Sequence, residues 1–234
     1  MDSNSNTIEK GYDMKYLVHW LNIDTHPHTY KDIAISSFGA IFGIFVTYYG
    51  TKLFLGEQIA FLITASMGAS AVLLFAVPHG VLSGPWSVIG GHTISALIGV
   101  FVAQHIADPI VASSVGVGSA VLAMQTLRCV HPPGGATALI AVIGGSAVHD
   151  LGYGFVLFPV VINALMITVS AVAYNSFFPW RRYPPVFIRP SKPSVSNAIS
   201  AVDIENAIRE LDIYVDISSD ELLEIYDHAI QNRR

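Results

Sequence analysis

The chain has 234 residues, of which 52% are hydrophobic and only 12% are charged, whereas an ordinary soluble domain carries about 25% charged residues. Between Ile33 and Trp180 there are five charged residues, and all the others crowd into the two ends. A stretch of this length with so few charges has no plausible water-facing surface. The composition therefore excludes a soluble globular domain and predicts an integral membrane protein.

The charge and cysteine content exclude several other classes. The net charge is −5 and no long basic run is present, so we expect no nucleic-acid partner. One cysteine, Cys129, excludes an internal disulfide framework and the paired-cysteine metal sites, and we expect it to be a small buried side chain. We expect no resident cofactor. The first 31 residues have acids but no apolar core, so the sequence predicts neither a signal peptide nor a transit peptide.

Six apolar runs follow one another through the middle of the chain. Five have the length needed to cross a hydrocarbon core about 30 Å thick, and one is too short unless it tilts or is re-entrant. We therefore expect an all-α helical bundle of five to six transmembrane segments, some of them short or re-entrant. The runs are 33–50, 58–77, 88–107, 110–130, the short 134–148, and 153–178.

Basic residues flank the apolar part on both sides. Lys10, Lys15 and Lys31 precede the first run, and Arg181 and Arg182 follow the last. Because cytoplasmic flanks are enriched in Lys and Arg, both termini are expected in the cytoplasm, which requires an even number of crossings. With no transit peptide, a bacterial plasma membrane is favoured over a plastid envelope.

Four parts can be separated along the chain. They are a cytosolic N-terminal segment 1–31, a transmembrane domain 32–180, a Pro- and Ser-rich linker 181–197 and a cytosolic tail 198–234. The tail is predicted to hold two amphipathic helices, over 203–211 and 219–230, the second capped by Ser218 or Ser219. A module this small docks more readily than it folds alone, so we expect a homo-oligomer, with a dimer favoured by base rate.

The densest group of chemically useful residues lies between Arg128 and Thr137. Pro132 and Pro133 end one helix and begin the next, and glycines follow. Unpaired N–H groups at this helix start, with Arg128 and His131 beside them, would attract a small anion. The expected anion site consists of Arg128, His131, Gly134, Gly135, Ala136 and Thr137.

A second group is expected to open the third span in the same way. Here Gly90, Gly91 and His92 are predicted to form another helix N-terminus. His79, His92 and His131 together form an alternative, a three-histidine metal site. Ser70, Gln125, Asn163 and His79 are predicted to line the pathway, and Pro159 is predicted to kink the last span.

The segment His131–Thr137, with its His-Pro-Pro tripeptide, resembles the HPP family of integral membrane proteins, which is named for that tripeptide. The blocks 66–75, 85–92 and 95–100 also look like family blocks, so the resemblance covers roughly 31–179. The family is usually described with four spans. Members in plastids and cyanobacteria are associated with nitrite transport, so the resemblance implies a carrier of a small inorganic anion, nitrite first.

Two other functions stay open. The chain is also compatible with a membrane sensor or assembly subunit that signals through its tail, or with a transition-metal transporter that uses the histidines. No nucleophilic triad spacing, phosphate-binding loop or carboxylate pair is present, so we do not expect an enzyme or catalytic residues. His92 and His131 are expected either to bind the anion or to carry a co-transported proton.

Overall fold

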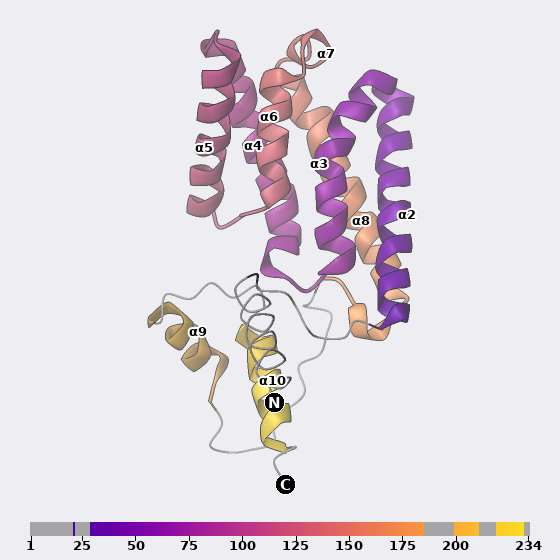
Figure 1. Cartoon of the computed structure of the whole chain (residues 1–234), viewed down its shortest axis with the longest axis vertical. Helices are drawn as coiled ribbons and strands as arrows, with labels where there is room; N and C mark the ends of the chain where they lie inside the picture. Colours follow the sequence, from indigo (N-terminus) through magenta and orange to yellow (C-terminus); the bar gives the residue numbers. More distant parts are fainter. Residues whose placement is uncertain (1–20, 22–28, 185–198, 211–218, 232–234) are drawn as a thin grey trace, which may run out of the picture. The chain divides into compact units, whose positions relative to one another are not determined.

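A computed structural model of the chain describes residues 21, 29–184, 199–210 and 219–231. By its contacts the chain divides into Met1–Ile33 and Ala34–Arg234. The second unit holds an all-α bundle with helices running alternately up and down (Figure 1). The helices of the bundle are α2 Tyr30–Leu55, α3 Glu57–Ala76, α4 Pro85–His105, α5 Pro109–Thr126, α6 Pro132–Ile143, the short α7 Ser146–His149, and α8 Ile162–Ser176 after a π-helical segment Val156–Val161.

Six apolar segments traverse the bundle, as the sequence predicts. Among the described residues, five helices are long and apolar enough to cross a membrane when Val156–Ser176 is counted as one, and α6 is shorter. Twelve residues of α-helix extend about 18 Å, less than the hydrocarbon core. The structure thus confirms an all-α membrane bundle.

Helices α2 and α8 run in opposite directions and contact each other through side chains. Near the start of α2, the carbonyl of Ile35 accepts a hydrogen bond of 2.9 Å from the hydroxyl of Tyr174, which lies near the end of α8. We call the end of the bundle where α2 begins and α8 ends the terminal end; the connections 77–84 and 127–131 also lie there (Figure 1).

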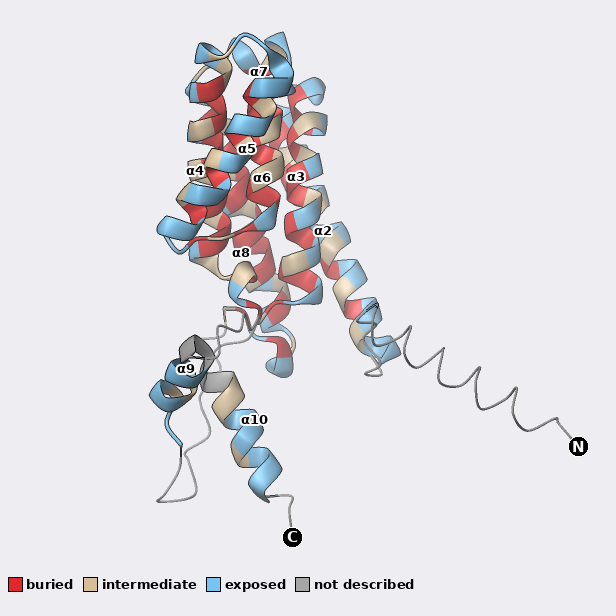
Figure 2. Ribbon diagram, turned by 60° about the vertical axis from the view of Figure 1, so that its left-hand side comes forward, coloured by how far each residue is buried: buried red, intermediate tan, exposed pale blue. Residues whose placement is uncertain are grey.

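Helix α6 buries the largest share of its residues, followed by α3, α4 and α8, whereas α2 and α5 leave most of theirs unburied (Figure 2). The buried residues of α2 include Gly39, Gly43, Thr47 and Thr51, one every four residues, which is one narrow helix face. The small residues leave room for aromatic rings of neighbouring helices, since a Cβ atom at Gly39 would lie 2.5 Å from the ring of Phe75 and 2.7 Å from that of Tyr174. The rest of α2 exposes Phe, Ile and Leu side chains, as a lipid-facing surface requires.

Pro159 interrupts the last span, as predicted. Phe158 has φ −141° and ψ 114°, outside the helical region, because a proline disfavours helical geometry in the residue before it. The side-chain amide of Asn163 donates a hydrogen bond of 2.8 Å to the carbonyl of Pro159. This carbonyl also accepts from the backbone N–H of Ile162, so the kink is held by one side-chain and one backbone hydrogen bond.

The terminal end of α3 is closed by side chains from three other segments. Ser83 donates to the carbonyl of Leu73 at 3.1 Å, Asn175 donates to that of Leu74 at 3.2 Å, and Arg181 donates to that of Phe75. Helix C-termini leave carbonyls without helical partners, and a cation is favourable there. Arg181, expected as a cytosolic flanking charge, is instead buried and caps a helix.

Tyr183 follows in the same closing segment. It is buried, and its hydroxyl donates to the carbonyl of Ser83 at 2.7 Å. Burial raises the pKa of the Tyr183 phenol, so it stays neutral and donates over the physiological pH range. The chain after α8 is thereby fixed to the connection between α3 and α4.

The two predicted tail helices are present, as α9 Ala201–Glu210 and α10 Ser219–Gln231. The first begins two residues earlier than predicted because Ser200 and Asp203 cap each other's backbone N–H groups, at 3.2 and 2.8 Å. Most of the predicted linker, 185–197, and the predicted cap Ser218 lie outside the described residues.

Candidate functional site

A chain of hydrogen bonds among four buried polar side chains lies inside the bundle. The hydroxyl oxygen of Ser70 lies 2.8 Å from Nε2 of His92 and 2.9 Å from Nε2 of His131. Nδ1 of His92 lies 2.7 Å from the hydroxyl of Thr137. Nδ1 of His131 lies 2.8 Å from the carbonyl oxygen of Leu82. All four side chains have no exposed surface, and we call this group the histidine network.

Three helices supply the network. Ser70 lies on α3, His92 in the second turn of α4, and Thr137 on α6, while His131 is the residue that precedes α6. The proline pair after His131 sets the start of α6, which places the imidazole of His131 within reach of Ser70. Sequence reasoning chose all four residues, but it did not identify Ser70 as the bridge, because hydrogen-bond partners on separate helices leave no local pattern.

The start of α6 differs from the expected open anion site. Pro132 and Pro133 have no N–H group, and the N–H of Gly134 donates to the carbonyl of His131 at 2.8 Å. Gly135 and Ala136 follow within the helix, where N–H groups bond to carbonyls four residues back. The expectation of unpaired N–H groups at Gly134, Gly135 and Ala136 is therefore wrong for this conformation.

Gly90 and Gly91 also have a different role from the one expected. The helix α4 begins at Pro85, so both glycines lie inside it rather than at its N-terminus. A Cβ atom at position 91 would lie 2.9 Å from the carbonyl oxygen of Cys129, and one at position 90 would lie 3.1 Å from the Cβ of Cys129. These glycines provide close packing against the segment that carries His131, not space for a ligand.

Arg128 lies apart from the network. Its side chain is exposed, whereas His131 is fully buried. Its backbone has φ 53° and forms the left-handed residue of a Schellman motif, with hydrogen bonds from Arg128 N–H to Gln125 O and from Cys129 N–H to Met124 O. The structure does not bring Arg128 and His131 together as one enclosed site.

The four predicted pathway residues divide into different environments. Ser70 is the centre of the network, whereas Gln125 is exposed on the outer face of α5 and so does not line the interior. Asn163 is buried and its amide nitrogen lies 2.6 Å from the Thr51 hydroxyl, linking α8 to α2. His79 lies in the terminal-end loop, 3.2 Å from the carbonyl of Arg182.

The three-histidine metal site is not formed. His92 and His131 use their ring nitrogens within the network, and His79 does not join them. Across the described ranges of the chain, no three His, Cys, Asp or Glu side chains converge as metal ligands. A fixed metal centre made of these histidines is therefore wrong for this conformation.

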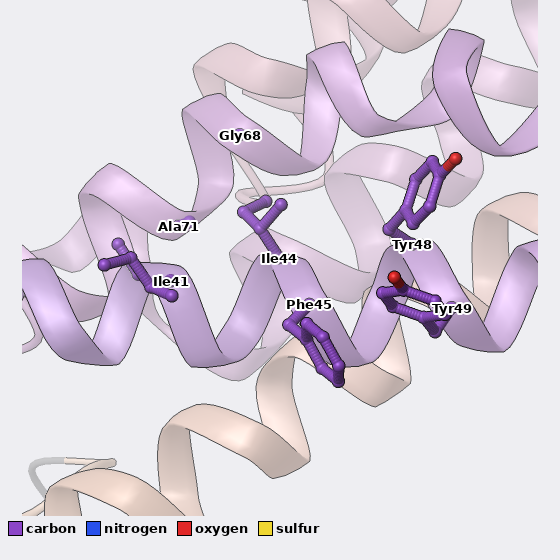
Figure 3. A pocket seen from close by; sticks show the side chains of 8 residues that line it. Ile41, Ile44, Phe45, Tyr48, Tyr49, Gly68 and Ala71 are labelled. Atoms are coloured by element: carbon purple, nitrogen blue, oxygen red, sulfur yellow. The ribbon is translucent and has the colours of Figure 1, made fainter.

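Two hollows lie away from the network. A cavity of about 140 Å³ lies at the end of the bundle opposite the terminal end, and its polar lining is Gln104 and His149. A wider groove of about 510 Å³ lies between α2 and α3 (Figure 3). The groove is open and almost wholly apolar, so it suits lipid chains rather than an anion; it is lined by Ala40, Ile41, Ile44, Phe45, Tyr48, Tyr49, Gly68 and Ala71.

The fold and the buried network define an all-α, multi-pass integral membrane protein. The family model described as "HPP, transmembrane region" matches residues 25–184, and the chain belongs to this family. Two transmembrane proteins of Dictyostelium discoideum are similar to it, at 33% and 31% identity over 154 residues, which is 64% of this chain and 53% and 48% of the relatives. The chain thus spans about half the length of these curated relatives. No solved structure matches.

Proposed function

We propose that the protein carries a small inorganic anion across a cell membrane, with nitrite as the first substrate to test. The histidine network is proposed as the polar binding site on the path of the anion. The observation that supports this is a buried chain of hydrogen bonds through two imidazoles and two hydroxyls, inside a bundle with few charged residues. Polar groups inside a membrane domain are costly and usually functional. The proposed orientation, with the terminal end in the cytoplasm, follows from the Lys and Arg flanks.

A route to the network from the opposite end is proposed along the contact between α4 and α6. Ala141 lines the cavity of Gln104 and His149 and lies one helical turn after Thr137. Between them the helices touch, since a Cβ atom at Gly99 would lie 2.6 Å from the carbonyl oxygen of Ala138. Transport then requires α4 and α6 to separate at this contact, because the network is closed to both sides here.

The test is nitrite uptake into proteoliposomes that contain the purified full chain. His92→Gln and His131→Gln are expected to lower uptake by about tenfold or more, the effect of losing a buried hydrogen-bonding group that faces an anion. His105→Gln is the matched control, because His105 is exposed and its Nδ1 bonds only the carbonyl of Phe101. Equal uptake in all three variants, with normal folding, would overturn the proposal.

Two further measurements separate the other functions. If removal of residues 198–234 abolishes function in cells while the histidine variants remain active, the tail is the functional part and the sensor or assembly subunit is correct. Uptake of a transition metal that depends on His92 and His131 would favour the metal transporter.

The proposed route is tested by Ala103→Phe, which fills the cavity lined by Gln104 and His149. This variant is expected to reduce nitrite uptake without disturbing the histidine network.

A further inference from the structure

The histidine network has a direction, which one backbone carbonyl determines. The oxygen of Leu82 can only accept a hydrogen bond, so the nitrogen 2.8 Å away, Nδ1 of His131, must carry a proton. Two uncompensated charges are costly in such a dry interior, so both imidazoles are taken as neutral in the resting network. Nε2 of His131 then has no proton and must accept one from the Ser70 hydroxyl.

The remaining bonds follow from the first. Ser70 has one hydroxyl proton, which it donates to His131, so its oxygen accepts from Nε2–H of His92. His92 is then unprotonated on Nδ1, which accepts from the Thr137 hydroxyl at 2.7 Å. All donors point one way, from Thr137 through His92 and Ser70 to His131. The two histidines are therefore opposite tautomers.

We propose that His92, Ser70 and His131 bind a single additional proton, which Ser70 passes from one imidazole to the other. Each hydroxyl in the network has a second acceptor one turn back on its own helix: the carbonyl of Ser66 lies 3.2 Å from Ser70, and that of Pro133 lies 3.3 Å from Thr137. When His131 is protonated on Nε2, it donates to Ser70, whose own proton turns to Ser66. When His92 is protonated on Nδ1, it donates to Thr137, whose proton turns to Pro133. Either charged form leaves no donor or acceptor without a partner.

The transfer step balances without any other reactant. A proton that arrives at Nδ1 of His92 releases the proton on Nε2 of the same ring to the Ser70 oxygen, and Ser70 gives its original proton to Nε2 of His131. N–H bonds form at Nδ1 of His92 and Nε2 of His131, and one N–H bond breaks at Nε2 of His92, so the charge moves from one ring to the other. His92 is left neutral with its proton on Nδ1, and the Ser70 hydroxyl can then donate to its Nε2 as well as to the Ser66 carbonyl. No covalent bond other than those to hydrogen changes.

Two protons at once are disfavoured. The ring centroids of His92 and His131 are 4.9 Å apart, and two cations at that distance repel strongly in a dry interior. Within the described part of the chain no carboxylate lies beside them, since α4, α5, α6 and α8 contain no acid and the one acid of α3, Glu57, lies 13 residues before Ser70. The other titratable or charged side chains on the segments packed around the network include Arg128, Cys129, His79, His105, His149, Tyr174, Arg181 and Tyr183.

Coupling of this proton to transport rests on the proposed function. A monovalent anion and one proton together are neutral, which removes most of the cost of moving charge through the hydrocarbon layer. A network that holds one proton therefore predicts electroneutral symport of one anion with one proton.

The proton site is tested by nitrogen-15 NMR of the full chain in lipid nanodiscs with labelled histidine. The signals of His92 and His131 are assigned by their loss in His92→Gln and His131→Gln. At neutral pH we expect His131 protonated on Nδ1 and His92 on Nε2, and on acidification one imidazolium shared by the pair. The same tautomer in both rings, or two protons taken up together, would overturn the proposal.

Variants at the hydroxyls give an independent readout. Ser70→Ala is expected to abolish the opposite-tautomer pattern and to lower proton-driven nitrite uptake by about tenfold or more, whereas Ser70→Thr keeps both. Should Ser70→Ala fail to fold, Thr137→Val is expected to leave His131 protonated on Nδ1 and His92 on Nε2, because Leu82 and Ser70 set both tautomers. It is expected to confine the added proton to His131, because His92 protonated on Nδ1 then has no acceptor. Opposite tautomers without any uptake would overturn the anion proposal and leave the proton site. Uptake with identical tautomers would overturn the proton site alone.

Discussion

Gly91 and His131 approach so closely that a Cβ atom at position 91 would lie 2.6 Å from the Cβ of His131. This contact sets how near α4 comes to the segment before α6. His92, the next residue along α4, and His131 can both reach the Ser70 hydroxyl only because this approach is short. A glycine inside a helix thus controls the geometry of a hydrogen-bond network one residue away.

Gly91→Ala is therefore expected to destabilise the bundle by about 1–3 kcal/mol, the usual cost of overpacking, because the new Cβ meets the Cβ of His131 and the carbonyl oxygen of Cys129. Gly118→Ala on α5 is the matched control, since nothing lies within 4 Å of its Cβ position. It is expected to be neutral or to stabilise by up to about 1 kcal/mol through helix propensity. Unfolding in mixed micelles measures both, and equal stabilities would contradict the role given to Gly91.

Arg128 offers a way to separate charge from backbone conformation. A left-handed residue other than glycine costs roughly 1–2 kcal/mol, so Arg128→Gly is expected to stabilise the turn after α5 by about that amount relative to Arg128→Ala. Both variants remove the guanidinium. If the guanidinium charge of Arg128 recruits anions to the terminal end, both variants are expected to reduce nitrite uptake equally, although their unfolding free energies differ. Unequal uptake that follows stability would show that Arg128 acts through the backbone.

The architecture could be predicted from the sequence because membrane segments are local features. Each apolar run has its own length, and the flanking charges fix an even number of crossings. The kink at Pro159 and the two tail helices are also local, since proline geometry and end caps act within one or two turns. The all-α bundle, the kink and the two tail helices are confirmed by the structure, whereas the even number of membrane crossings stays a prediction.

The site could be predicted only in part, because its geometry depends on contacts between helices. Motif reasoning selected His131 and His92 but treated the glycines near them as ligand space, whereas Gly91 serves close packing. It assigned Gln125 to the interior, because the sequence of a helix that is apolar on all sides does not show which face points into the bundle. It also read Arg181 as a surface charge, although the open carbonyls at the end of α3 hold it inside.

Thr51 and Asn163 form the polar link between α2 and α8. The amide nitrogen of Asn163 lies 2.6 Å from the Thr51 hydroxyl, and its carbonyl oxygen lies 2.9 Å from the same atom. Thr51→Val and Asn163→Leu are each expected to cost about 1–2 kcal/mol, and the double variant less than the sum, with a coupling of about 0.5–2 kcal/mol. Additive losses in mixed-micelle unfolding would show that the two side chains act independently.

Asp203 is expected to give the start of α9 a defined response to pH. Hydrogen bonds from the Ser200 side chain, and then from its backbone N–H, lower the pKa of the Asp203 carboxyl. A lowered pKa in the folded state means that the cap contributes fully above the ordinary aspartate value of about 4 and is lost as pH falls through the lowered pKa. Backbone amide exchange over residues 200–206 in the full chain should therefore accelerate on acidification. Asp203→Asn should remove this pH step, and Glu224→Gln on α10 should leave it unchanged; a step that persists in Asp203→Asn would assign it to another group.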